Sequence, residues 1–288
     1  MDIKVTNWYG GKLRMVSKLK ALVPAHKVYC EPFMGSAALL LNKVRSEQEI
    51  TCDLDSGMVC LMSALGDEVK GQELIKKLCS LEYNEMAFNH AKECQKNGYA
   101  GMNDIEKSVA VYTLVSQSFN ATGKGFSKKL YKSTSDYQRT IKLHLPQAYK
   151  RLQGVDIRYC NGIDMLSKLA DVEEAFVFAD PPYCHELRGE SATNIYGCEM
   201  SEMEHIRMLE IMQKAKCKIL LCGYKAEKND LYDRYLLPHG WHCYKLCDIA
   251  KSCKPAEKRD FAEEFIWVNY ELPDAAKYVI SLKEHSSL

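Results

Sequence analysis

Three short apolar runs, each followed at once by an acidic residue and a turn, constrain this chain more than any other feature. The runs end immediately before Glu31, Asp53 and Asp180. Runs this short that are apolar on both faces suit strands covered by helices on each side. Strands are expected at 28–30, 50–52, 155–159, 175–179, 218–222 and 265–270, with helices at 37–43, 165–170 and 203–215. This alternation predicts an α/β fold.

The strand–helix rhythm stops between residues 61 and 151. That stretch favours helices at 68–80, 84–96 and 105–118. A chain of 288 residues allows one large domain or two modest ones. We therefore expect an α/β domain formed by residues 1–60 and 152–288, with a mainly helical insertion at 61–151.

The charge is distributed unevenly, although the formal net charge is only +1. Residues 120–151 hold eight basic residues and one acid, Asp136, so this segment carries +7 and the remainder −6. A basic segment that also carries aromatic residues, here Phe119, Phe126, Tyr131, Tyr137 and Tyr149, can bind a polyanion locally. A solvated lysine-rich loop is the alternative.

The polar residues at the strand ends indicate a ligand site, because ligands of doubly wound sheets bind beyond the carboxyl ends of the strands. The turn at Gly35 lacks the G-x-G-x-x-G phosphate signature, and Glu31 would repel a phosphate. Asp53 follows Glu31 by 22 residues, close to the spacing at which an acid receives ribose hydroxyls. S-adenosylmethionine (AdoMet) has a ribose and an ammonium but no phosphate. A plain strand–turn–helix stays open as the alternative.

The tetrapeptide Asp180-Pro181-Pro182-Tyr183 is the sharpest signal. Two successive prolines fix the backbone and remove two N–H donors, which leaves carbonyl oxygens to accept. A carboxylate, a rigid carbonyl and an aromatic ring suit a planar group that bears an NH2. The alternative is a buried turn without a ligand.

A glycine pair lies beside two aromatic residues and a cation near the N-terminus, in the stretch Asn7-Trp8-Tyr9-Gly10-Gly11-Lys12. The Lys12 ammonium could reach the carboxylate of a bound amino acid. A surface turn is the alternative.

In these motifs and their order, the chain resembles the Dam-type DNA adenine-N6 methyltransferases, including phage and restriction-system relatives. The match continues through Leu221-Cys222-Gly223-Tyr224 and Glu264-Phe265-Ile266-Trp267-Val268-Asn269-Tyr270. The resemblance implies a Rossmann-like AdoMet-dependent methyltransferase sheet with a helical target-recognition insertion. The chain departs from the family at Met34-Gly35-Ser36, which replaces a more glycine-rich turn, and it matches the target-recognition region only loosely.

The resemblance also implies the roles of individual residues. Asp180, Pro181, Pro182 and Tyr183 would be catalytic. AdoMet would be bound by Trp8, Tyr9, Gly10, Gly11, Lys12, Glu31, Pro32, Phe33, Gly35, Asp53, Asp164 and Asp180. The resemblance implies double-stranded DNA as the substrate, and the +7 charge of residues 120–151 indicates that Lys124, Lys128, Lys129, Lys132 and Arg139 would contact it. The product would be S-adenosylhomocysteine, and the target adenine would be flipped out of the duplex.

Two other functions stay open from the residues: methylation of cytosine N4 or another amine, and DNA binding by an inactive member of the fold. No metal is expected, because Cys243, Cys247 and Cys253 lack zinc-site spacing, and Cys184 is expected to be structural. The odd number of cysteines, 13, and the absence of a signal peptide or a long apolar run favour the cytoplasm and no membrane. A monomer or weak dimer is expected, and a cognate restriction endonuclease stays open as a partner.

Overall fold

The computed structural model describes residues 2–183, 200–225, 230–250 and 261–280. Its strands are β1 (Val28–Glu31), β2 (Gln48–Asp53), β3 (Asp156–Tyr159), β4 (Ala175–Ala179), β5 (Lys218–Tyr224), β6 (His242–Ala250) and β7 (Phe261–Val268). They form one seven-stranded sheet in the order β3-β2-β1-β4-β5-β7-β6. The run 3-2-1-4-5 is the strand order of the doubly wound Rossmann fold. The expected α/β class is therefore confirmed.

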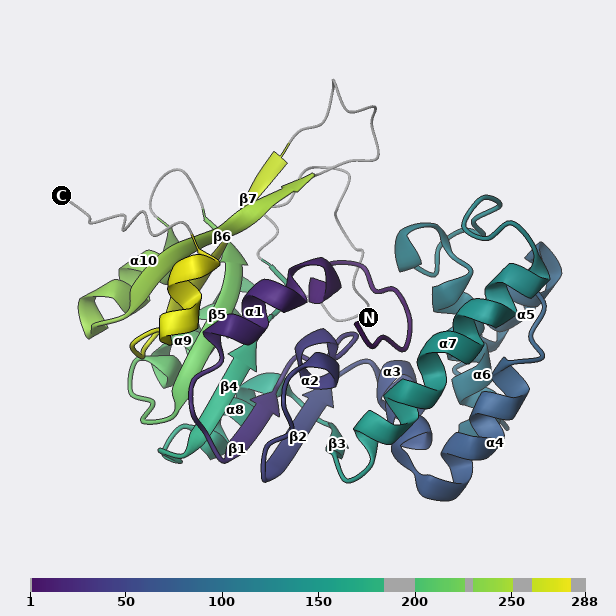
Figure 1. Cartoon of the computed structure of the whole chain (residues 1–288), viewed down its shortest axis with the longest axis horizontal. Helices are drawn as coiled ribbons and strands as arrows, with labels where there is room; N and C mark the ends of the chain where they lie inside the picture. Colours follow the sequence, from purple (N-terminus) through teal and green to yellow (C-terminus); the bar gives the residue numbers. More distant parts are fainter. Residues whose placement is uncertain (1, 184–199, 226–229, 251–260, 281–288) are drawn as a thin grey trace. The chain divides into compact units, whose positions relative to one another are not determined.

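Parallel and antiparallel pairings divide the sheet at β5. β1, β4 and β5 are parallel, with Cys30 paired to Val177 and Val177 to Ile219. β7 is antiparallel to both β5 and β6 (Figure 1). Because β1 and β4 run in the same direction, Glu31 and Asp180 both lie at the carboxyl edge of this part of the sheet.

The chain divides into two compact units. Unit 1 comprises Met1–Val16, Met34–Val44 and Thr51–Tyr159, and unit 2 comprises Ser17–Phe33, Arg45–Ile50 and Cys160–Leu288. The predicted insertion, 61–151, falls within unit 1, and its role in target recognition stays a prediction.

Unit 1 is mainly helical. Its helices are α2 (Ala38–Asn42), α3 (Ser56–Gly66), α4 (Glu68–Leu78), α5 (Glu85–Lys96), α6 (Asp104–Ser116) and α7 (Thr134–Leu152), with short 3-10 turns η1 (Lys12–Met15) and η2 (Phe119–Ala121). α3 packs against α4, α6 and α7, and α5 packs against α6. Phe88 and Tyr137 are among its fully buried side chains.

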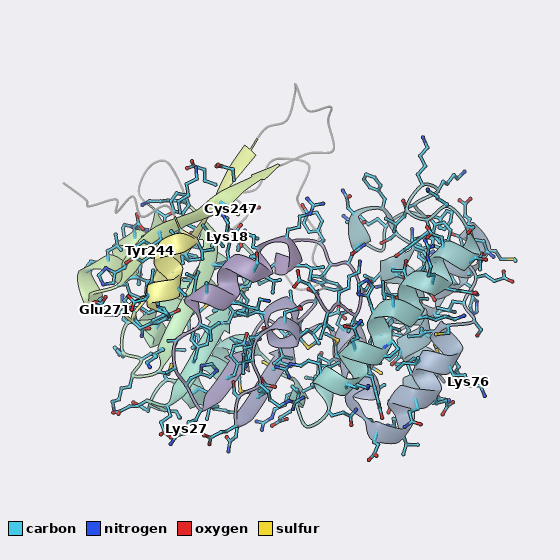
Figure 2. All side chains as sticks on the ribbon, in the orientation of Figure 1. Lys18, Lys27, Lys76, Tyr244, Cys247 and Glu271 are labelled. Atoms are coloured by element: carbon cyan, nitrogen blue, oxygen red, sulfur yellow. The ribbon has the colours of Figure 1, made fainter. Side chains whose placement is uncertain are left out.

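Unit 2 contains α1 (Val16–Leu22, from Ser17 onward), α8 (Gly162–Leu169), α9 (Glu202–Met212), α10 (Leu231–Leu236), η5 (Leu237–His239) and η7 (Asp274–Tyr278). α9 packs against α8 and α10. Lys18 on α1 donates to the carbonyl oxygen of Leu246 on β6 at 3.0 Å, and Figure 2 labels Lys18 and the next β6 residue, Cys247. The core includes Tyr29, Phe176 and Trp267, all fully buried.

Several elements differ from the sequence expectations. β6 was not expected because its sequence alternates polar and apolar residues, as edge strands do, instead of forming an apolar run. α7 covers the second half of the basic segment, where apolar residues recur at helical spacing among the charges. Its buried residues are Tyr137, Ile141, Leu145, Ala148 and Leu152. α3, α1 and α10 were also missed.

Within the part of the chain that the structure describes, none of the helices combines the length and the apolarity needed to cross a membrane.

Candidate active site

Asp180 stands directly after β4, whose five residues are all buried. Its carboxylate is half-buried, and Pro181 and Pro182 follow it. The hydroxyl of Tyr183 lies 3.1 Å from Oδ1 of Asp180. The tyrosine ring meets the ring of Tyr224, at the end of β5, edge-on with centroids 4.6 Å apart. The tetrapeptide thus presents a carboxylate, a proline carbonyl and an aromatic ring within four consecutive residues.

A second acid lies beneath this tetrapeptide. Glu264 on β7 is fully buried, and its Oε1 is also hydrogen-bonded to the Tyr183 hydroxyl. In the sheet it pairs with Tyr224 on β5 and with Cys247 on β6. One polar atom each of Asp180, Cys222 and Glu264 lies within 4.8 Å of the others. Burial, followed by the neighbouring Asp180 and Glu264, raises the pKa of Tyr183 well above its usual value, so its hydroxyl keeps its proton.

The end of β1 is packed tightly. Glu31 is buried, and its Oε1 accepts a hydrogen bond of 2.6 Å from the hydroxyl of Tyr29, two residues earlier on the same face of the strand. The turn after it, Pro32-Phe33, lies against Gly162 at the start of α8. A Cβ at Gly162 would lie 2.2 Å from the Pro32 carbonyl oxygen, so only glycine fits there.

In unit 1, the end of β2 is joined to the turn at Gly35. Oδ2 of Asp53 accepts from the Gly35 N–H at 2.8 Å, and Oδ1 accepts from the Asp55 N–H at 2.9 Å. Burial raises the pKa of Asp53, although these N–H donors act in the opposite direction. Gly35 has a positive φ of 46°, and a Cβ there would lie 3.0 Å from Nε1 of Trp8. The structure therefore brings together Trp8, Gly35 and Asp53.

The predicted N-terminal turn is present. The N–H of Gly11 donates to the Trp8 carbonyl oxygen at 3.0 Å, and Gly10 has a positive φ of 72°. Lys12 begins η1 and is buried, and its ammonium lies 3.3 Å from the carbonyl oxygen of Gly10. Tyr9 is half-buried.

The model of one protein family, described as D12 class N6 adenine-specific DNA methyltransferase, matches residues 8–246. This range contains the turn at Trp8, the ends of β1, β2 and β4, and the helical segment. The chain belongs to this family. It is an adenine-N6 DNA methyltransferase.

Three known proteins or structures are similar to this chain to different degrees. The methyltransferase is 23% identical to the type II methyltransferase M.MjaIII of Methanocaldococcus jannaschii, over 94% of this chain and all of that protein. Two solved structures of the rRNA methyltransferase AviRa of Streptomyces viridochromogenes are similar at 12% identity with a TM-score of 0.36. They cover 92% and 93% of this chain and 86% and 87% of theirs.

Asp164 of the methyltransferase lies in the first turn of α8 and is exposed. Its carboxylate forms an ion pair of 2.7 Å with Arg207 on α9. Its expected contact with AdoMet stays a prediction. Cys243 and Cys247 lie on β6, whereas Cys184 and Cys253 lie outside the described residues.

The expected DNA contacts all lie on the surface of unit 1. Lys124, Lys128, Lys129, Lys132 and Arg139 are exposed. Lys128 lies 3.9 Å from Glu85, and Arg139 pairs with Asp136 at 2.5 Å. Exposed pairs of this kind contribute little to stability, so both cations can exchange the acid for a phosphate.

Most aromatic residues of the basic segment turn inward instead of facing solvent. Phe126, Tyr131 and Tyr137 pack around Tyr83, with ring centroids 5.2, 5.2 and 5.7 Å from it. The hydroxyl of Tyr149 donates to the Glu68 carbonyl oxygen. Phe119, in contrast, is 55% exposed. Phe126, Tyr131 and Tyr137 therefore pack beneath the loop that carries Lys128 and Lys129, and binding of a polyanion by this segment stays a prediction.

Two residues were missed as functional candidates. Glu264 lies in the family-like stretch 264–270, but no function was predicted for it. Its signal in the sequence is an acid beside the apolar run Phe265-Ile266-Trp267-Val268, which indicates a buried polar contact. Tyr83 anchors the loop between η2 and α7, which we call the basic loop. Its hydroxyl donates to the Ser127 carbonyl oxygen and accepts from the Leu130 N–H. No local pattern distinguishes Tyr83 from any other tyrosine.

Proposed function

We propose that Asp180 and the carbonyl oxygen of Pro181 accept the two hydrogens of the adenine amine during methylation. The placement of a half-buried carboxylate directly after a buried strand, followed by a proline, carries the proposal. The amine is a poor nucleophile because its lone pair is delocalised into the ring. Hydrogen bonds from both amine hydrogens favour a pyramidal nitrogen, and the Asp180 carboxylate stabilises the positive charge that develops there.

Tyr183 is proposed to stack on the flipped adenine. Flipping costs a few kcal/mol, and stacking on an aromatic ring contributes about 1–3 kcal/mol per base. The support is that the tyrosine hydroxyl is anchored by two carboxyl groups, which fixes the plane of the ring before the base arrives.

We propose AdoMet as the methyl donor, bound by the residues that the family resemblance names. The structure contains features that fit it. Asp53 is held by two backbone N–H groups in a fixed orientation that suits ribose hydroxyls. Glu31 is a buried acid that disfavours a phosphate-bearing cofactor. When bound, AdoMet supplies a methyl group attached to a positively charged sulfur, and none of the proposed residue roles needs a metal.

Double-stranded DNA is proposed to bind along Lys124, Lys128, Lys129, Lys132 and Arg139. Their exposure and the +7 charge of residues 120–151 support this. We further propose a monomer or weak dimer that acts in the cytoplasm. A cognate restriction endonuclease is the partner expected if the chain belongs to a restriction system.

The decisive experiment incubates the enzyme with AdoMet and duplex DNA, digests the DNA to nucleosides and identifies the methylated base. N6-methyladenine is expected from the parent enzyme. Asp180→Ala should lower the single-turnover rate by several orders of magnitude while the protein stays folded, because Asp180 is only half-buried and lies beyond the end of β4. Asp171→Ala is the matched control, since Asp171 is an exposed acid of unit 2 paired with Lys216.

A different methylated base would replace the proposed substrate. A folded Asp180→Ala variant that methylates at more than about a tenth of the parent rate would remove Asp180 from the mechanism, because loss of a charge-assisted contact in the transition state should cost more.

A further inference from the structure

We propose that Glu264 is a positioning residue that shares one proton with Asp180 through the hydroxyl of Tyr183, and thereby holds both the tyrosine ring and the amine-accepting carboxylate in place. The proposal rests on the proposed role of Asp180. It gives a function to a buried acid that the reaction does not otherwise use.

The Tyr183 hydroxyl contacts two acids but has one hydrogen. The Tyr183 hydroxyl lies within hydrogen-bonding distance of Oδ1 of Asp180 and Oε1 of Glu264. A hydroxyl has only one hydrogen to donate. Both contacts can be hydrogen bonds only if one of the two carboxyl groups carries a proton and donates it to the tyrosine oxygen.

The carboxyl groups of Asp180 and Glu264 also lie close together. Polar atoms of Asp180 and Glu264 lie within 4.8 Å of each other in a largely buried site. Two ionised carboxylates so close together repel each other, and a proton shared between them removes that repulsion. Among the described residues, Cys222 also lies close to Glu264, and Tyr224 on β5 and Cys247 on β6 pair with it in the sheet.

Asp180 and Glu264 differ in burial. Glu264 is fully buried, whereas Asp180 is half-buried. Burial disfavours the charged form, so the proton resides mainly on Glu264 and the negative charge on Asp180. The hydrogen bonds then run from Glu264 to Tyr183 and from Tyr183 to Asp180. This direction leaves the charge at the carboxylate that faces the amine.

The main test is a double-variant cycle on single-turnover methylation by the full-length enzyme. Glu264→Leu removes the acid, and Tyr183→Phe removes only the hydroxyl. Each should slow the reaction by about fivefold to tenfold, the scale of one hydrogen bond. The double variant should be no slower than the slower single variant, because both changes break the same chain. Additive losses would overturn the proposal, since Glu264 would then act independently of Tyr183.

Glu264→Gln tests the charge. The neutral amide can still donate to the tyrosine oxygen, so it should recover most of the rate lost in Glu264→Leu. The matched control is Glu263→Gln, because Glu263 is the preceding acid on β7 but is exposed. A Glu264→Gln variant as slow as Glu264→Leu would show that an ionised acid is needed there.

Infrared spectroscopy reads the proton directly. The parent enzyme at neutral pH should show the C=O stretch of a buried protonated carboxyl, absent in Glu264→Gln and retained in Glu263→Gln. The lack of this band in the parent enzyme would overturn the shared proton. If the parent enzyme forms no N6-methyladenine, or if Asp180→Ala is fully active, the proposed function fails instead, whatever the infrared result.

Discussion

At Gly162 two segments more than a hundred residues apart approach so closely that no side chain fits between them. A Cβ there would lie 2.2 Å from the carbonyl oxygen of Pro32 and 2.7 Å from Cε1 of Phe33. The first helical residue of α8 therefore determines the position of the turn that follows Glu31. A residue with no functional group of its own thus supports the predicted cofactor site.

Gly162→Ala should displace that turn. We expect the free energy of unfolding to fall by about 1–3 kcal/mol, as for other overpacking substitutions, and the affinity for AdoMet to fall with it. Denaturant unfolding and calorimetry measure the two effects. Gly125→Ala is the control, because a Cβ at Gly125 meets no atom within 4 Å. Equal stabilities of the two variants would contradict the packing argument.

The proposed role of Asp53 predicts that AdoMet binding depends on pH. Burial raises its pKa in the free protein, so its contribution to stability is present at acidic pH and is lost as the pH rises through the folded-state pKa. Ribose hydroxyls bind the ionised form, so AdoMet affinity should change in the opposite direction and weaken on acidification. Asp53→Ala should raise the dissociation constant by about tenfold, the scale of a charge-assisted hydrogen bond, and should flatten this pH dependence. Calorimetry over the acidic range tests both, and Asp171→Ala should behave like the parent.

At the scale of elements, the basic loop between η2 and α7 is held by aromatic packing, and its charges stay outside. Tyr83, just before α5, contacts the rings of Phe126 and Tyr131 and hydrogen-bonds the backbone at both ends of the 127–130 stretch. Lys128 and Lys129 lie on this supported stretch and are exposed. A loop fixed in this way can present phosphate-binding groups with little loss of entropy on binding.

The double substitution of Lys128 and Lys129 by Gln should flatten the salt dependence of DNA binding. Each phosphate contact contributes about −0.9 to the log–log slope, so the slope should change by up to about 2 units. Binding to one duplex is measured at several salt concentrations. The same double substitution at Lys76 and Lys77 on α4, also exposed, controls for the change in net charge. Identical slopes for the parent and the Lys128/Lys129 variant would place the DNA-binding face elsewhere.

At the scale of the whole molecule, the fold was predictable where the signal is local. An apolar run that ends in an acid and a turn identifies β1, β2 and β4 without knowledge of their neighbours. β6 and α7 were not predicted, because charged residues among their apolar residues obscure the pattern that would identify the buried face. The role of Glu264 could not be predicted, because it depends on Tyr183, which is 81 residues away in the sequence and meets Glu264 only in the folded sheet.

The uneven charge gives the intact enzyme a characteristic response to salt. Residues 120–151 carry +7, although the chain carries only +1. Salt screens exposed charges but affects buried contacts much less. Rising ionic strength should therefore raise KM for duplex DNA and leave kcat at saturating DNA nearly constant. Steady-state kinetics across a salt series test this expectation, and a parallel fall in kcat would show that the basic segment also contributes to the chemical step.

The order of the strands in the sheet also matters while the protein is being made. Val28 of β1 pairs with Ala175 of β4, so the two partners are 147 positions apart in the sequence. A ribosome that adds about 5–20 residues per second needs roughly 7–30 s to synthesise that stretch. The edge of β1 that will pair with β4 therefore stays unpaired during this time. Helices α3 to α7 are synthesised in the same interval and pack against helices that are near them in the sequence. An apolar strand edge exposed for that long invites aggregation. The yield of this enzyme in a cell thus depends on how that edge is shielded during translation as well as on the stability of the finished fold.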